Sequence, residues 1–198
     1  MVELEVSEFC VDLQALSQLV LNDFGATLQI LRWVGREFGD AAERPNRIED
    51  CIATMGVQTC IEVMSTQCIQ TRKPSMALSE LSSHSKEIAV QSAQIAELMF
   101  NIDPAQAYFV GLCHSIGSLP ALLSGSANDD QRLDTVATGL AMAKDWALPD
   151  CVIDYFSDVQ KSGGNSPWSE ILRVAHQCPG DAESEGSSEA ELLMSCAG

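Results

Sequence analysis

Basic residues are scarce in this chain of 198 residues: 11 lysines and arginines stand against 28 aspartates and glutamates, a formal net charge of −17. Such a charge disfavours non-specific binding of DNA or RNA and adhesion to anionic lipid. No apolar run approaches the ~18 residues of a membrane span. The start, residues 1–5, lacks the basic and apolar regions of a signal peptide. We expect a cytoplasmic protein that binds neither nucleic acid nor membrane.

Cysteine pairs of the form Cys-x-x-Cys are also absent, although the chain has eight cysteines. Disulfide frameworks are typical of small secreted chains, and this sequence shows no sign of secretion. Four of the cysteines fall among apolar residues at helical spacing: Cys51, Cys60, Cys113 and Cys151. We interpret them as small buried hydrophobic residues in a reducing compartment, with reactive thiols or a metal site as the alternative.

Strand patterns are almost absent, and the chain has no Asn-Gly or Asp-Gly hairpin signal. Apolar residues instead recur with a helical period between proline and glycine breaks. The sequence therefore predicts an all-α fold, a compact bundle of about nine or ten helices. The expected helices cover residues 12–22, 24–37, 46–55, 57–70, 76–100, 104–115, 118–124, 131–147, 149–160 and 167–177.

Several helix boundaries carry capping signals. Residues 46–49, Asn-Arg-Ile-Glu, read as a capping box, and Asp103-Pro104 and Ser166-Pro167 each place a capping side chain before a proline. One predicted helix has an apolar face with close helical spacing. That face consists of Leu133, Val136, Ala137, Leu140 and Ala141.

The chain divides into three parts. We expect an N-terminal extension over residues 1–11 and one helical domain over residues 12–178. From Gly180 onward there are five acidic residues and no basic one, interspersed with serine and glycine. This composition predicts a disordered acidic tail over residues 179–198.

Four of the basic residues lie close together in one segment: Arg32, Arg36, Arg44 and Arg47. The simpler interpretation is a solvated face with local ion pairs, since acidic residues are interspersed with them. The alternative is a contact for an anion or an acidic partner. Residues 12–35 could form a helix-turn-helix, but they contain no basic recognition helix.

Local signatures of catalysis are missing. The chain has only three histidines, and no Gly-x-Ser-x-Gly motif or phosphate-binding glycine-rich loop occurs. The two features with a recognisable pattern are His84-Ser85 within one predicted helix, and residues 103–117, which read Asp-Pro-Ala-Gln-Ala-Tyr-Phe-Val-Gly-Leu-Cys-His-Ser-Ile-Gly.

This combination resembles the HD superfamily, and more closely its HDOD branch, a family of bacterial signalling domains with the pattern Asp-Pro-x-x-Ala-x-x-x-Gly-Leu-x-His-Asp-x-Gly. Residues 21–32, residues 47–56 and the Trp-Ala-Leu-Pro sequence at 146–149 are similar to further HDOD segments. The resemblance covers about residues 12–178. Nothing before Asp12 matches the usual first segment, so we expect the family's initial helix to be missing or replaced, which would expose apolar surface for a partner.

The resemblance implies a degenerate metal site. In HD phosphohydrolases a histidine, a His-Asp pair and a later aspartate bind the metal. His84 and His114 correspond to the two histidines, whereas Ser115 replaces the adjacent aspartate and His176 aligns with the later one. Thr135 stands where a further histidine is common. A site without carboxylates suits Mg²⁺ or Mn²⁺ poorly, so we expect His84 and His114 to be hydrogen-bonded core residues. Retention of a softer ion such as Zn²⁺ is the alternative.

The predicted function is a non-catalytic bacterial signal-transduction or regulatory module that binds another signalling protein. We expect no catalytic residue, no cofactor and no metal. The enzyme alternative is an HD-type metal-dependent phosphohydrolase with a ligand set built from His84, His114 and His176. A nucleotide or second-messenger sensor is the third hypothesis, and it would need a basic pocket that the sequence does not display.

Overall fold

The computed structural model describes residues 13–39, 44–45, 47–67, 76–98, 102–124 and 134–178. These residues form α-helices and one short 3-10 helix with no strand, which confirms the predicted all-α class. The elements are α1 (Leu13–Leu21), α2 (Phe24–Phe38), α3 (Ile48–Met55), α4 (Val57–Gln67), α5 (Met76–Leu98), α6 (Pro104–Cys113), η2 (Ile116–Ser118), α7 (Leu119–Ser124), α8 (Thr135–Asp145), α9 (Asp150–Ser162) and α10 (Pro167–Ala175). The predicted extension (1–11) and acidic tail (179–198) lie outside the described residues.

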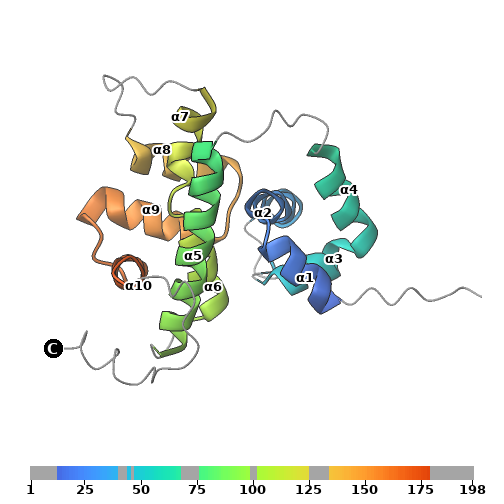
Figure 1. Cartoon of the computed structure of the whole chain (residues 1–198), viewed down its shortest axis with the longest axis horizontal. Helices are drawn as coiled ribbons and strands as arrows, with labels where there is room; N and C mark the ends of the chain where they lie inside the picture. Colours follow the sequence, from blue (N-terminus) through green and yellow to red (C-terminus); the bar gives the residue numbers. More distant parts are fainter. Residues whose placement is uncertain are drawn as a thin grey trace, which may run out of the picture.

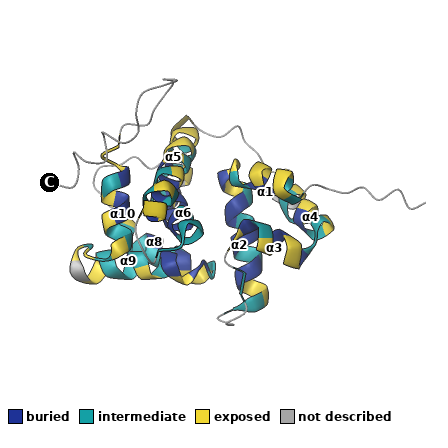
Figure 2. Ribbon diagram, turned by 90° about the horizontal axis from the view of Figure 1, so that it is seen from below, coloured by how far each residue is buried: buried dark blue, intermediate teal, exposed yellow. Residues whose placement is uncertain are grey.

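The helices form two groups that lie side by side (Figure 1). The first contains α1–α4, and the second contains α5–α10 around the long helix α5. Both groups turn buried residues inward (Figure 2). Most of the buried apolar side chains form one cluster that includes Leu31 and Ile52 from the first group and Phe109, Leu112 and Leu148 from the second. Ala96, Ala107 and Ile171 form a second, smaller cluster. Within the described residues, no helix combines the length and apolarity that a membrane span requires.

Two of the predicted helix starts are confirmed. The Asp103 carboxylate accepts a hydrogen bond from the Ala105 amide at 2.9 Å, and Pro104 is the first residue of α6. The Ser166 hydroxyl accepts from the Ser169 amide at 3.3 Å at the start of α10. These side chains satisfy amides that have no partner within the helix.

The predicted capping box at 46–49 is wrong in its cap residue. The N-cap of α3 is Arg47, whose side chain makes no capping hydrogen bond, and Asn46 lies outside the described residues. Burial of Ile48 and Ile52 holds this helix in place instead. Its first turn also carries two acidic side chains, which complement the positive end of the helix dipole.

The predicted apolar face of α8 is buried only in part. Gly139 and Ala143 are the buried residues of this helix, whereas Ala141 is exposed; Leu133 lies outside the described residues. The reason is the approach of the Phe156 ring, which lies so close to the Gly139 backbone that a Cβ atom there would overlap it. Helix α8 thus packs against α9 through its smallest residues.

The turn after α8 joins the two groups of helices. The Arg44 guanidinium donates a hydrogen bond to the Ala147 carbonyl oxygen, and the Arg32 guanidinium lies 5.4 Å from the centre of the Trp146 ring. A Cβ atom on Gly35 would overlap the same Ala147 carbonyl, so the backbone of α2 lies directly against this turn. Two of the four clustered arginines, Arg32 and Arg44, therefore contact this turn.

A second link between the groups lies on α6. The Tyr108 hydroxyl donates to the carbonyl oxygen of Leu21, the last residue of α1, at 3.1 Å. Burial is the main cause of a pKa of about 12 for Tyr108, so the hydroxyl stays protonated and remains a donor at neutral pH.

Replacing Arg32 by alanine is expected to lower the free energy of unfolding by about 1–2 kcal/mol, because it removes a cation–π contact and the packing of the aliphatic stem. The control is Arg36→Ala, one turn along the same helix at an exposed position, which is expected to cost less than about 0.5 kcal/mol. Urea denaturation of both variants measures the difference. Equal stability of the two variants would contradict the structural role of Arg32.

Four cysteines are buried and unpaired: Cys51, Cys60, Cys113 and Cys151. Their burial confirms their interpretation as small hydrophobic residues. Desolvation raises the pKa of Cys51 and Cys151 to about 12 and raises the pKa of Cys113 further. A thiol with such a pKa is almost wholly protonated at pH 8 and is therefore a poor nucleophile. Cys178, in contrast, is exposed.

Brief treatment of the native protein with iodoacetamide at pH 8 is expected to alkylate Cys178 and to leave these four buried cysteines unmodified. Peptide mapping by mass spectrometry measures the extent at each position, and the same treatment in denaturant provides the fully modified control. Alkylation of Cys113 at the rate of Cys178 would show that the core opens readily.

Candidate functional site: a cluster of three histidines

All three histidines of the chain meet at one place. His84 lies within α5, His114 directly follows α6, and His176 directly follows α10. The ring centroids are 5.2 Å apart for His84 and His114, 5.3 Å for His84 and His176, and 5.0 Å for His114 and His176. One ring nitrogen from each residue lies within 4.8 Å of the others.

The close contact of α5 and α6 brings the first two histidines together. Gly111 of α6 faces the backbone of α5: a Cβ atom there would lie 2.7 Å from the Ala89 Cα and 2.8 Å from the Ile88 carbonyl oxygen. Any larger residue would push the helices apart, so glycine is required for this close approach. His114, three residues beyond Gly111, is thereby held beside His84.

Helix α10 supplies the third histidine by packing on both of these helices. Its buried face consists of Ile171, Leu172 and Ala175. The buried positions recur at helical spacing, so the end of the helix is fixed against the core. His176 directly follows Ala175, the last residue of α10, and is therefore held in place by this packing.

Backbone carbonyl groups fix two of the rings. The Nδ1 atom of His114 lies 2.6 Å from the Gly111 carbonyl oxygen, and the Nδ1 atom of His176 lies 2.7 Å from the Leu172 carbonyl oxygen. Because a carbonyl oxygen only accepts, each Nδ1 must carry the proton and donate. In the neutral ring this leaves the lone pair on Nε2, the nitrogen that is then able to bind a metal.

Burial lowers the pKa of His114 to about 4, and the neighbouring rings of His176 and His84 lower it as well, although the hydrogen bond to Gly111 acts in the opposite direction. At neutral pH this ring is therefore uncharged. Neutral imidazole is the form that accepts a metal ion, and it is also the form that can lie beside other imidazoles without repulsion.

The expectation that His84 and His114 are core residues is only half right. His114 is half-buried and bonded to the backbone, but His84 is exposed on α5. His176 is exposed as well. The cluster is thus open to solvent on the side of these two rings. The structure places the ring of His176 beside the other two rings.

Ser115 does not replace the missing carboxylate with another anionic group. Its hydroxyl oxygen lies 2.8 Å from that of Ser85, a fully buried residue, so the two hydroxyls share a hydrogen bond. Ser85 therefore belongs to the site, although the sequence motif His84-Ser85 carries no signal for this hydrogen bond. Within the described residues, no carboxylate belongs to the group of potential ligands around the histidines.

The other predicted site residues lie outside this group. Thr135 is exposed at the first position of α8. Arg32 and Arg44 contact the turn after α8, Arg36 is exposed on α2, and Arg47 is 4.0 Å from the Asp103 carboxylate at the surface. A partner contact through this segment stays a prediction, which Arg36 and Arg47 are best placed to make.

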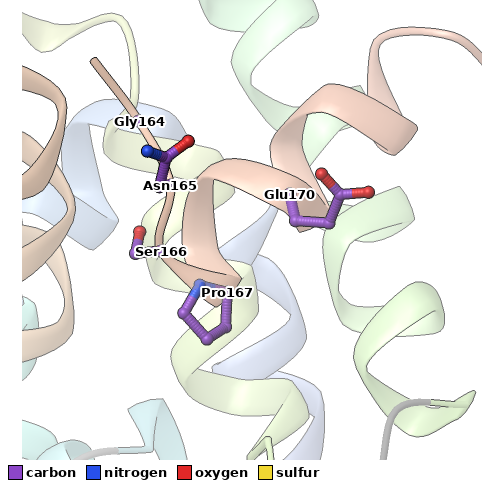
Figure 3. A pocket seen from close by; sticks show the side chains of 5 residues that line it. All are labelled: Gly164, Asn165, Ser166, Pro167 and Glu170. Carbon is purple, nitrogen blue, oxygen red and sulfur yellow. The ribbon is translucent and has the colours of Figure 1, made fainter. Parts of the chain in front are cut away.

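A solvent-open hollow lies at the other end of α10 (Figure 3). It is lined by Gly164, Asn165, Ser166, Pro167 and Glu170. Because α10 has nine residues, a length of about 13 Å separates this hollow from His176. The Ser166 hydroxyl caps the helix there, and the hollow brings together no histidine or cysteine, so we do not assign it a chemical role.

Comparison with known proteins identifies the family to which the chain belongs. No curated protein and no solved structure matches the chain. The sequence model of the HDOD domain matches residues 5–129, which include His84, Gly111, His114 and Ser115, whereas Thr135 and His176 lie beyond the matched region. The match covers well over half of the chain and agrees with the all-helical fold. It begins at residue 5, so the expectation that nothing before Asp12 belongs to the family is wrong, and it ends before the Trp-Ala-Leu-Pro sequence at 146–149, where the resemblance stays a prediction. The chain belongs to the HDOD family.

Proposed function

We propose that this chain is a non-catalytic regulatory module of a bacterial signalling system, which acts in the cytoplasm by binding another protein. Its HDOD domain makes it a signalling or regulatory module related to the HD superfamily. The observation that supports the absence of catalysis is the donor set of the histidine cluster. It offers three imidazoles and no carboxylate within the described residues.

Metal-dependent hydrolysis of a phosphoester needs a metal that activates water and, in most sites, a side chain that receives the proton. The adjacent residue that would provide a carboxylate is Ser115, and its hydroxyl bonds to the hydroxyl of Ser85. A hydroxyl paired in this way is a poor ligand for Mg²⁺ and has no basicity near neutral pH. These properties disfavour hydrolysis at this position.

Exposed apolar side chains support a role in protein binding. On the second group of helices Val90, Leu98 and Leu123 are 48 %, 61 % and 71 % exposed, and Leu19 of α1 is 68 % exposed. Val90 and Leu98 are eight residues apart on α5 and therefore lie on the same side of the helix. Covering such side chains by a partner removes apolar surface from water, which favours association.

A phosphohydrolase assay tests the proposal. The purified full chain is incubated with Mg²⁺, Mn²⁺ or Zn²⁺ and a panel of phosphomonoesters, nucleotides and cyclic dinucleotides. The expected result is no turnover above that of His84→Ala, a suitable control because His84 is exposed and its truncation should preserve the fold. Metal-dependent turnover that disappears in His84→Ala and His114→Ala would refute the non-catalytic role.

The binding part of the proposal needs its own test. Proteins captured by the full chain are purified and titrated against it, and a saturable complex of fixed stoichiometry is expected whose affinity is the same for the chain and for His84→Ala. If no captured protein binds in the purified system, the protein-binding role is lost.

The alternative is a phosphohydrolase with an altered ligand set, and one specific observation favours it. The third histidine occupies a place beside the first two, so three ligands for a metal are preserved in space although the carboxylates are absent. The turnover assay separates this alternative from the main proposal.

A further inference from the structure

We propose that His84, His114 and His176 together bind one transition-metal ion of the Zn²⁺ type, and that the site discriminates against Mg²⁺ and Mn²⁺. The proposal concerns binding alone. It does not depend on whether the chain acts as a regulatory module or as an enzyme.

The geometry is close to that of a metal site. One ring nitrogen from each histidine lies within 4.8 Å of the others, whereas ligands around a tetrahedral Zn²⁺ ion, with Zn–N bonds of about 2.0–2.1 Å, lie about 3.3 Å apart. Rotation of side chains supplies this contraction. His84 is exposed and can turn, while His114 and His176 are each held by a backbone hydrogen bond and provide the fixed ligands.

Two of the three rings already make the hydrogen bonds that metal-binding histidines commonly make. Histidine ligands commonly donate their second ring N–H to a backbone carbonyl or a carboxylate, which fixes the tautomer and the ring orientation. His114 and His176 already donate to Gly111 and Leu172 respectively. The protein has thus ordered two of three rings in the tautomer that a metal requires, without any metal being needed to hold them.

The donor set determines the class of ion. Imidazole nitrogen suits Zn²⁺, Cu²⁺, Ni²⁺ and Co²⁺, whereas Mg²⁺ and Mn²⁺ prefer carboxylate, carbonyl and water oxygens. The described ligand group contains histidine alone. The formal net charge of −17 attracts cations of any kind, so the selectivity must come from the ligands. Three protein ligands leave one tetrahedral position for a ligand from outside.

Because the chain has only three histidines, NMR of the histidine rings reports on the site without interference. The full-length chain, treated with chelator and labelled with ¹⁵N, is titrated with Zn²⁺ and separately with Mg²⁺. We expect the signals of all three rings to change together and to saturate at one Zn²⁺ per chain, with no change on addition of Mg²⁺. Calorimetry of the same titrations gives the affinity.

Variants identify the ligands. His84→Ala and His176→Ala, both at exposed positions, should fold normally by circular dichroism and bind Zn²⁺ at least about 10-fold more weakly. The matched control is Cys178→Ser, two residues beyond His176 at an exposed position, which should bind as tightly as the unaltered chain. His114→Ala is less decisive because this ring is packed against the core.

Three outcomes would overturn the proposal: no Zn²⁺ binding by the folded chain, Zn²⁺ binding that persists in both exposed-histidine variants, or Mg²⁺ binding of equal strength at the rings. The result is separable from the proposed function. Loss of this site would leave the protein-binding role intact, and hydrolysis by the zinc-loaded chain would refute the non-catalytic role while leaving the metal site in place.

Discussion

The contact between α5 and α6 is made by main-chain atoms, and the second group of helices is organised around it. Gly111 brings α6 so close to α5 that the Ala89 Cα and the Ile88 carbonyl occupy the space of a side chain. Side chains of ordinary size would hold the two axes further apart, as in most helix pairs. Helix α10 then packs against both, and the three histidines converge because these three helices do. The relative position of the three rings follows from the backbone contact between α5 and α6 and from the buried apolar face of α10.

The absence of a carboxylate has an electrostatic consequence. A half-buried aspartate next to three imidazoles would need a cation to compensate its charge, because removing an anion from water without a partner is costly. The hydroxyl pair of Ser85 and Ser115 carries no charge, and burial keeps His114 neutral as well. At the core of the cluster the protein has thus replaced a charged arrangement by a neutral one. Such an arrangement is stable with or without an ion.

The sequence predicted the helices better than the site. Asp103 and Ser166 could be recognised as helix starts because capping depends on neighbouring residues alone. The helices that follow them cover residues 104–113 and 167–175. The motif containing His114 and Ser115 was recognisable for the same reason. The convergence of His176 depends on how α10 packs, which no local pattern encodes. Arg32 and Arg44 contact the turn after α8, which lies far away in sequence. The local charge pattern could not predict these contacts and suggested a solvated face instead.

Ala147, in the turn after α8, has a φ angle of 46°, the described non-glycine residue with a positive value. For an alanine this left-handed conformation costs about 1–2 kcal/mol relative to ordinary backbone. The cost is borne at the point where Gly35 and Arg44 meet the Ala147 carbonyl. Relaxing the turn would therefore break the contacts of both neighbours at once. One carbonyl oxygen of the second group of helices thus serves as the anchor for two residues of the first group.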